Sequence, residues 1–394
     1  MEATVKNHLY QKAVRCGIPL HSTFELTARC NFRCPMCYVR LSAEEQRRRG
    51  RELTGAEWIS IAEQVKRAGT VFLLLTGGEP LLHPDFCQIY EKLSQMGFVI
   101  NVNSNAALID EEQLALFRKY PPRRFNITLY AASAEGYRRQ CGMPAYDDVL
   151  RGIRLLRDNG CSVRISLTLT PTNRAELPEL LRMAQALGTS VQASFYLSPP
   201  VRVNPDMTGK NLRLPPEDAA ALQLEYNRLR LGEPAFSEYA QRILAAAAAP
   251  QKGAEPIGEK NAAASTAAAG TEARGAPVQC RAGRAACWID WQGNLLSCGE
   301  LAAPSESLLS CSFDEAWQRL RAAVSDIRLA PACAACPLQS ICSPCAAKNF
   351  TETGSFEKRP DYVCELTHAY VELLRSETGS LQLAAGNRQQ APPC

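Results

Sequence analysis

The chain has 394 residues, and its 44 lysine and arginine residues nearly balance its 40 aspartate and glutamate residues, which leaves a net charge of +4. This length suffices for two to three domains, and so small a net charge argues against a protein that binds nucleic acid through charge. The longest apolar runs, such as residues 71–75, are far shorter than the roughly 18 residues that a membrane span needs. Residues 1–20 lack the apolar core of a signal peptide. We therefore expect a cytoplasmic protein with no membrane and no nucleic-acid partner.

The chain contains 17 cysteines, which is an unusual number for a protein without an export signal. In the reducing cytoplasm a disulfide framework is not expected. The cysteines are also grouped, with three between residues 30 and 37 and nine between residues 280 and 364. Reduced cysteines at short spacings indicate metal ligands.

Residues 22–200 alternate between strand-like and helix-like patterns. Strands are predicted at 22–27, 71–75, 98–103, 125–131, 162–170 and 191–197, and the intervening helices at 54–69, 85–97, 110–120, 146–160 and 174–187. Such repeated units predict an α/β fold with a parallel sheet, as either an open barrel or a doubly wound sheet. In both architectures the working site lies at the carboxyl ends of the strands.

The remaining chain divides by composition. Residues 1–21 form an N-terminal extension, residues 201–244 a helical bridging segment, residues 245–277 a low-complexity linker rich in alanine, and residues 278–370 a cysteine-rich module. The linker cannot bury enough apolar surface to offset its ordering entropy, so it is predicted to be flexible. Residues 371–394 are predicted to be a disordered tail.

The first cysteine group follows the first predicted strand directly. Cys30, Cys34 and Cys37 supply three thiolates within one loop, whereas an iron–sulfur cluster normally takes four protein ligands. Three ligands would leave one iron open, which is the mark of a reactive metal site. Spacing alone also allows a structural zinc with a distant fourth ligand, or three buried thiols.

The motif Cys30-x3-Cys34-x2-Cys37, followed by Tyr38, resembles the signature of radical S-adenosylmethionine (SAM) enzymes. The run Gly77-Gly78-Glu79-Pro80, which follows the second predicted strand, resembles the SAM-binding motif of the same family. The resemblance covers residues 20–200. It implies a partial (β/α)6 TIM-like barrel, followed here by a small cysteine-rich domain.

The same resemblance implies the cofactors and their contacts. Cys30, Cys34 and Cys37 would hold a [4Fe–4S] cluster, and SAM would chelate the open iron and be cleaved reductively to a 5′-deoxyadenosyl radical. The further residues implied to contact SAM are Tyr38 near the adenine, the segment Gly77, Gly78, Glu79 and Pro80 near the amino group, and Ser104, Asn105 and Ser166 near the ribose and carboxylate. The glycines would permit close approach of the backbone.

The second cysteine group offers eight ligands, the number that two fully coordinated [4Fe–4S] clusters need. Two zinc knuckles would use the same number. The spacing resembles that of the auxiliary-cluster domain called SPASM, apart from two residues in place of three between Cys342 and Cys345. This resemblance implies auxiliary cluster I on Cys280, Cys287, Cys298 and Cys345, and auxiliary cluster II on Cys333, Cys336, Cys342 and Cys364.

These resemblances imply a cytoplasmic, oxygen-sensitive radical SAM enzyme that modifies a peptide or protein. Our leading hypothesis is maturation of a ribosomally made peptide through a thioether or carbon–carbon cross-link, with electrons from a flavodoxin- or ferredoxin-type donor. One alternative is a sulfatase maturase that forms formylglycine and needs a general base, which the sequence does not identify. Another is a zinc-binding scaffold without catalysis. Cys141 follows the fourth strand near the rim, where it could face the substrate.

Overall fold

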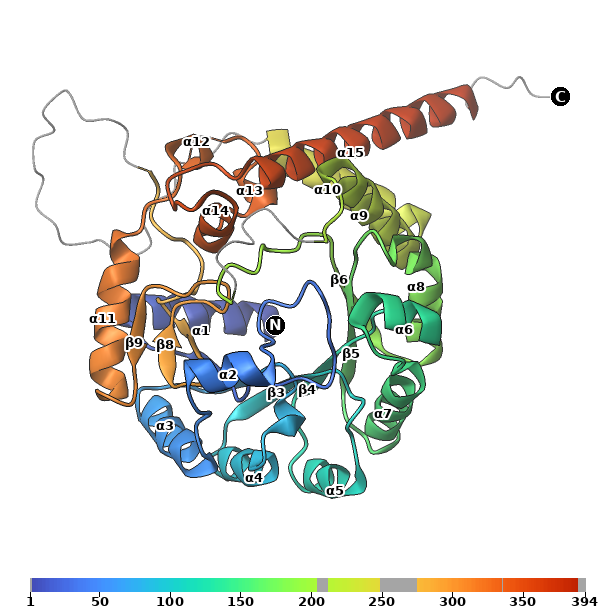
Figure 1. Cartoon of the computed structure of the whole chain (residues 1–394). Helices are drawn as coiled ribbons and strands as arrows, with labels where there is room; N and C mark the ends of the chain where they lie inside the picture. The colour runs from blue at the N-terminus through green and yellow to red at the C-terminus, as the bar shows by residue number, and fades with distance from the viewer. Residues whose placement is uncertain (1, 204–211, 249–274, 335, 389–394) are drawn as a thin grey trace, which may run out of the picture. The chain divides into compact units, whose positions relative to one another are not determined.

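A computed structural model describes residues 2–203, 212–248, 275–334 and 336–388 (Figure 1). The described residues separate into two compact units by their contacts. The first contains the described parts of 1–194, 198–212 and 277–327. The second contains those of 195–197, 213–276 and 328–394. None of the described helices is both long and apolar enough to cross a membrane.

The first unit is built on a nine-stranded sheet, in which six parallel strands take the order β6-β5-β4-β3-β2-β1. The strands are β1 (His21–Glu25), β2 (Phe72–Thr76), β3 (Val99–Ser104), β4 (Arg124–Thr128), β5 (Val163–Thr168) and β6 (Ser190–Ser194). The helices that connect them are α3 (Gly55–Arg67), α4 (Phe86–Gln95), α5 (Glu111–Lys119), α7 (Tyr146–Asp158) and α8 (Leu177–Ala186), and they surround the strands (Figure 1). The predicted strand–helix alternation and the partial-barrel class are therefore confirmed.

The alternation of side chains along the strands explains this arrangement. In β3 and β5 every second residue is buried, while the residues between them are only half-buried. The buried face packs against the helices, as where Phe24 of β1 stacks on Trp58 of α3 with ring centroids 5.0 Å apart. The half-buried residues of β3 and β5 are mostly polar, such as Asn101, Asn103 and Ser166. Helix α3 begins at Thr54 with the predicted capping box to Glu57.

The sheet continues past β1 into residues that the sequence assigned to the separate module 278–370. Strand β7 (Ala286–Ile289) pairs parallel to β1, and β8 (Asn294–Leu296) and β9 (Ser305–Ser307) follow in antiparallel order. With helix α11 (Phe313–Asp326) they belong to the first unit. The predicted domain boundary is therefore wrong, because the free edge of β1 needs hydrogen-bond partners and β7 supplies them.

Several elements of the first unit were not predicted. They are α1 (Glu2–Cys16), α2 (Ala43–Arg49), α6 (Ala134–Cys141) and the 3₁₀ turns η1 (Pro80–Leu82) and η2 (Arg174–Glu176). Helix α1 lies within the predicted extension 1–21, and its Tyr10 and Ala13 pack against Leu20 and Ala285. The extension is thus part of the core of this unit.

The second unit is helical. Its helices are α9 (Pro216–Leu231), α10 (Glu233–Ala248), α12 (Pro331–Ala334), α13 (Gln339–Cys342), α14 (Ala346–Thr353) and α15 (Asp361–Arg388). Phe236 of α10 and Leu374 of α15 are fully buried in one apolar cluster.

Two predicted boundaries change in this unit. The predicted disordered tail 371–394 is wrong as far as residue 388, since α15 extends to Arg388 and buries Val371 and Leu374. Residues 245–248 of the predicted linker complete α10. Residues 249–274, which form most of that linker, and residues 389–394 lie outside the described part of the chain.

Candidate functional site

The candidate site lies at the carboxyl ends of β1, β2 and β3, where three predicted motifs meet. Loop 26–42 follows β1 and carries the three cysteines, Gly77 and Gly78 follow β2, and Asn105 follows β3. Because parallel strands end at one edge of a sheet, the three loops are neighbours at the functional rim of the barrel.

Backbone hydrogen bonds join the cysteine loop to the glycine loop. Gly78 N–H donates to Thr27 O over 2.8 Å, and Glu79 N–H donates to Arg29 O over 2.8 Å. The chain immediately before Cys30 is thereby fixed against the end of β2.

The two glycines are required by this close approach. A Cβ atom at Gly77 would lie 2.6 Å from Thr27 O, and one at Gly78 would lie 2.3 Å from Arg29 O. Both distances are far below van der Waals contact. The backbone of the cysteine loop therefore leaves no room for a side chain at Gly77 or Gly78.

Glu79 connects the glycine loop after β2 to the end of β3 through hydrogen bonds. Its carboxylate is completely buried, and it accepts hydrogen bonds from Ser104 Oγ over 2.9 Å and from Asn105 N over 2.8 Å. Burial raises the pKa of Glu79 to about 7. The Ser104 hydroxyl is therefore engaged by a protein partner.

Asn105 extends the chain of contacts to the cysteine loop. Its side-chain N–H donates to Asn31 Oδ1 over 2.7 Å and lies 3.9 Å from Cys30 Sγ. Asn31 was not predicted as a site residue. Its place within the motif, next to Cys30, was the only available signal.

The three thiols of the loop are close enough to influence one another. Burial is the main cause that raises the pKa of Cys30 to about 12, and the charges of Glu79, Cys37 and Cys34 contribute to the same increase. Burial likewise raises the pKa of Cys37. Thiols in such surroundings ionise only when a compensating positive charge is present, and a bound metal cluster supplies that charge.

This donor set fits an iron–sulfur cluster. Three cysteines of a four-iron cluster each bind a different iron, so they need not converge on one point. Among the residues that the structure describes, no three histidine, cysteine or carboxylate side chains converge as ligands of one mononuclear ion would. The loop thus provides three soft ligands and leaves a fourth position open.

Cys34 forms hydrogen bonds with two residues that lie outside the cysteine loop, Cys141 and Tyr130. A hydrogen bond with Cys141 and burial raise the pKa of Cys34, while the Tyr130 hydroxyl donates a hydrogen bond to the same sulfur. Cys141 is fully buried on α6, and its backbone carbonyl accepts from Arg33 N over 2.8 Å. Cys141 therefore lies beside a predicted metal ligand, in a buried position.

Tyr38 lies at the other end of the cysteine loop, beside a cluster that the sequence did not predict. The guanidinium of Arg202 lies 5.8 Å from the centre of the Tyr38 ring and 5.9 Å from that of Trp288. Arg202 Nη2 also forms an ion pair with Glu25 over 2.7 Å. Glu25 ends β1, and its position in the strand was the only sequence signal for it.

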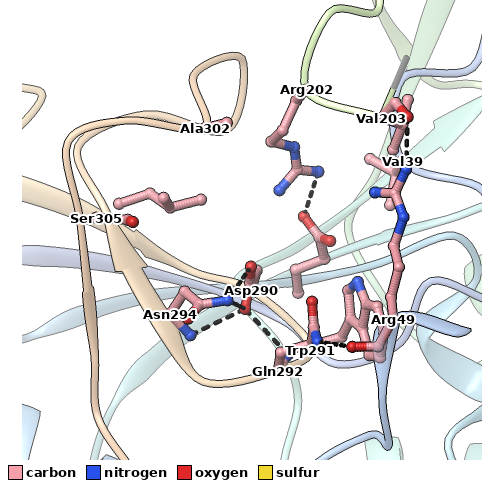
Figure 2. Close-up of a pocket in the computed structure, with 12 residues that line it drawn as sticks. Val39, Arg49, Arg202, Val203, Asp290, Trp291, Gln292, Asn294, Ala302 and Ser305 are labelled. Atoms are coloured by element: carbon pink, nitrogen blue, oxygen red, sulfur yellow. Dashed lines mark hydrogen bonds and ion pairs between the residues drawn. The ribbon is translucent and has the colours of Figure 1, made fainter. Parts of the chain in front are cut away.

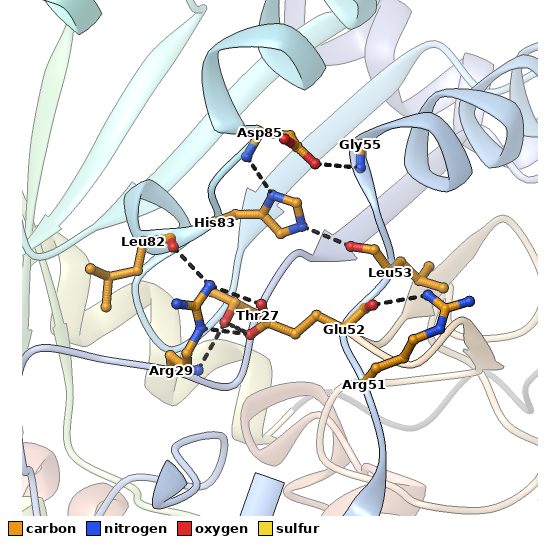
Figure 3. A network of polar contacts seen from close by, with 9 residues as sticks. All are labelled: Thr27, Arg29, Arg51, Glu52, Leu53, Gly55, Leu82, His83 and Asp85. Atoms are coloured by element: carbon orange, nitrogen blue, oxygen red, sulfur yellow. Dashed lines mark hydrogen bonds and ion pairs between the residues drawn. The ribbon is translucent and has the colours of Figure 1, made fainter. Parts of the chain in front are cut away.

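A polar network connects the cysteine loop to Glu52 and to Leu82 O through Arg29 (Figure 3). Arg29 binds both carboxylate oxygens of Glu52, through Nε over 2.9 Å and Nη2 over 2.8 Å, and Thr27 also donates to Glu52. His83 Nδ1 accepts from Asp85 N, and its Nε2 donates to Leu53 O. Bidentate arginine–carboxylate pairs fix geometry well, so this network positions the loop.

Comparison with known proteins agrees with this geometry. Residues 24–184, which span the cysteine loop and the strand–helix units to α8, match the model described as the radical SAM superfamily. The chain carries a radical SAM domain.

The chain is similar in sequence or fold to three further proteins. It is 25% identical over 346 residues to the AdoMet-dependent heme synthase of Methanosarcina barkeri, covering 86% of this chain and 94% of that protein. It is 26% identical to the PqqA peptide cyclase of Granulibacter bethesdensis, covering 44% of this chain and 46% of that protein. The structure of Streptococcus suis SuiB bound to precursor peptide SuiA has the same fold, with a TM-score of 0.63, 17% identity and coverage of 91% and 78%.

Ser166 lies inside the radical SAM domain but at a different strand. It occupies the half-buried inner face of β5, opposite Thr128 of β4. The predicted Pro80 begins the 3₁₀ turn η1 and is buried. Pro80 thus lies in the glycine loop after β2, whereas Ser166 lies within β5.

The second unit brings four predicted ligands of auxiliary cluster II together. The thiols of Cys336 and Cys342 raise the pKa of Cys333, after the larger effect of burial. Burial raises the pKa of Cys364 to about 11, and the other three thiols act in the same direction. Arg359, next to this group, opposes the increase at Cys364. Cys345 caps α14.

Two of the cysteines assigned to auxiliary cluster I differ sharply in their surroundings. Cys280 is exposed in the loop before β7. Cys287 lies within β7, where it is 3% exposed, and its Sγ is 3.3 Å from Ser22 Oγ of β1. Because side chains alternate along a strand, Cys287 faces away from Trp288. Cys298 is half-buried after β8.

Proposed function

We propose that this radical SAM enzyme binds a [4Fe–4S] cluster through Cys30, Cys34 and Cys37 and cleaves SAM reductively. The cluster, when bound, supplies the electron that breaks the carbon–sulfur bond of SAM and yields the 5′-deoxyadenosyl radical. The observation that carries the proposal is the group of three half-buried, mutually close thiols on the rim, backed by Gly77 and Gly78. Tyr38, Glu79, Pro80, Asn105 and Ser166 are proposed to line the SAM site, together with Ser104.

We propose auxiliary cluster II on the thiols that the second unit brings together, namely Cys333, Cys336, Cys342 and Cys364. Full coordination by protein suits a cluster that relays electrons. For auxiliary cluster I the resemblance alone supports Cys280, Cys298 and Cys345. We leave Cys287 out, because its thiol is buried in the sheet against Ser22.

We propose a peptide as the substrate, modified by abstraction of hydrogen from one of its C–H bonds. Support comes from the similarity to a peptide cyclase and from the shared fold with SuiB, whose structure contains a precursor peptide. A low-potential flavodoxin or ferredoxin is the proposed electron donor.

A heme-forming reaction on a tetrapyrrole is a second candidate. It is favoured by the match to the heme synthase, which extends over 94% of that protein. The two candidates share the chemistry of SAM cleavage and differ only in what the radical attacks.

One experiment tests both. Anaerobically reconstituted protein is incubated with SAM, reductant and either any short peptide encoded beside its gene or a tetrapyrrole, and the products are analysed by mass spectrometry. Peptide modification requires a mass change in the peptide together with 5′-deoxyadenosine. A change in the tetrapyrrole alone would support the second candidate. No 5′-deoxyadenosine with any substrate would contradict the SAM chemistry itself.

A further inference from the structure

A pocket of about 220 Å³ lies at the carboxyl ends of β1 and β7, within the first unit (Figure 2). Its wall combines the end of β1, the cysteine loop, the end of α2, the segment after β6 and the β7–β8 hairpin. The lining residues include the charged Glu25, Arg49, Arg202 and Asp290 and the apolar Trp291. The pocket also contains Val39, two residues after Cys37, so an occupant would lie close to the cysteine loop.

The pocket is closed on one side by the pair Glu25–Arg202. Glu25 is 1% exposed, and its Oε2 accepts hydrogen bonds from Arg202 Nη2 over 2.7 Å and from Trp288 Nε1 over 2.8 Å. Its Oε1 is buried without a hydrogen-bond partner, and so is Nε of Arg202. Such unmatched buried groups are costly, and a bound ligand is one way to satisfy them.

The charges of the lining exclude a strongly charged occupant. Two carboxylates, of Glu25 and Asp290, face two guanidinium groups, of Arg49 and Arg202, so their formal charges cancel. Asp290 accepts from the backbone N–H groups of Gln292 and Asn294 in its own hairpin. A charged ligand would lose its hydration here without a net opposite charge in return.

The unmatched atoms define the chemistry of the ligand more closely. Oε1 of Glu25 needs a donor and Nε of Arg202 needs an acceptor, and the two groups belong to one ion pair. A primary carboxamide offers an N–H donor and a C=O acceptor on one edge. Trp291 and Leu296 provide an apolar wall for the methylenes that carry such a group.

We propose that this pocket is a substrate subsite that binds the side-chain carboxamide of an asparagine or glutamine in the substrate peptide. This inference rests on the proposed peptide substrate and makes it more specific. The carboxamide fills the pocket against Glu25 and Arg202, and the neighbouring peptide segment is held beside the cysteine loop. Glu25 and Arg202 are thus proposed specificity-determining residues.

The test uses full-length reconstituted protein with SAM and a matched set of capped amino acids, followed by saturation-transfer NMR titration. The probes are N-acetyl-glutamine N-methylamide, the corresponding glutamate γ-methyl ester, and the glutamate and lysine analogues. All share their backbone amides, so differences in affinity report on the side chain. We expect the carboxamide to bind about tenfold more tightly than the ester, because the ester lacks the donor to a charged acceptor.

Two variants complete the test. In Glu25→Gln the preference for carboxamide over ester should fall to less than about threefold, because the charged acceptor is gone. Arg48→Met is the matched control, since Arg48 is exposed, pairs with Glu44 on α2 and does not line the pocket; it should keep the preference.

Several results would overturn the inference. They are equal binding of amide and ester by the unmodified protein, tighter binding of a charged probe, or no binding of any probe. The probe measurements require no turnover, so they can fail while the encoded peptide is still modified. Conversely, a protein that binds the carboxamide but modifies no peptide would contradict the proposed function alone.

Discussion

The two cysteine groups offer the same thiol chemistry in different surroundings. The first occupies a loop at the rim of a parallel sheet, beside two glycines and the buried carboxylate of Glu79. The second lies on the short helices α12 and α13 and at the start of α15, and its charged neighbour is the cation Arg359. In the first group the charge of Glu79 raises the pKa of Cys30, whereas in the second Arg359 lowers that of Cys364.

This difference distinguishes the proposed reactive centre from the proposed electron relay. A rim loop with three ligands leaves room for a small molecule, and glycines let the backbone approach closely. A four-thiol group among helices offers full coordination and no open position. Substitutions in each cysteine group test whether the two groups differ in this way.

Loss of one ligand in the first group should have the largest effect. In Cys34→Ala the three-cysteine set is incomplete, so formation of 5′-deoxyadenosine from SAM and dithionite should fall by more than about a thousandfold. The product is measured by chromatography. Cys16→Ala, which changes an exposed thiol on α1, is the control. If Cys34→Ala kept substantial SAM cleavage, the first group would not be the reactive centre.

The glycine loop should come next. In Gly78→Ala the new Cβ meets Arg29 O at 2.3 Å, so the cysteine loop must shift and SAM cleavage should fall by about ten- to a hundredfold. Gly160→Ala is the comparison, because nothing lies within 4 Å of its Cβ. That variant, at φ +78°, should lose about 1 kcal/mol of stability but keep its SAM cleavage. Equal losses in both variants would show that strain, and not the contact with Arg29, explains the effect.

Loss of a ligand in the second group should leave SAM cleavage intact. Cys333→Ala should remove about four of the twelve irons expected for three four-iron clusters, while 5′-deoxyadenosine formation without substrate changes less than about twofold. Iron is measured by colorimetry. Abolished SAM cleavage in a folded Cys333→Ala protein would contradict the separation of roles.

Cys287 provides a matched contrast with Cys333. We expect Cys287→Val to retain all its iron, since the thiol lies in the sheet interior, with a change in stability below about 2 kcal/mol. Iron analysis and thermal unfolding measure the two quantities. A loss of about four irons in Cys287→Val would restore Cys287 to the ligands of auxiliary cluster I.

The buried carboxylate of the first group should produce a small effect of pH on stability. Burial raises the pKa of Glu79 from 4.5 to about 7, so folding favours its protonated form. Its contribution is therefore unchanged below pH 4.5, becomes less favourable as the pH rises towards 7, and is constant above that. The difference in unfolding free energy between wild type and Glu79→Gln should change by up to about 3 kcal/mol across this range. Parallel stability profiles would contradict the raised pKa.

Much of the fold could be predicted, because period-two burial in the strands and capping signals such as Thr54 are local properties. The pairing of β7 with β1 could not, since Cys287 and Ser22 are far apart in sequence and only the folded sheet brings them together. The same long-range contact buries Cys287, a predicted ligand, in the sheet. The helical course of residues 371–388 was missed because its buried side chains, such as Leu374, depend on α9 and α10.

The motifs of the site were visible in the sequence, but their mutual contacts were not. Gly78 was predicted to approach SAM, and the structure shows it against the backbone of Arg29. Glu25 and Arg202 gave no motif, because their pairing joins the first strand to the segment after the sixth. Short-range spacing therefore indicates ligands well, and long-range contacts decide which of them are available.

The most direct test is electron paramagnetic resonance of the reduced, reconstituted protein before and after SAM is added. To reduce the overlap with other clusters, the measurement uses Cys333→Ala, which is expected to lack auxiliary cluster II, beside the wild type. We predict that SAM changes the g-values of the cluster held by Cys30, Cys34 and Cys37 in both proteins. An unchanged spectrum at saturating SAM, with the cluster present and reduced, would contradict an open iron at the rim of the barrel.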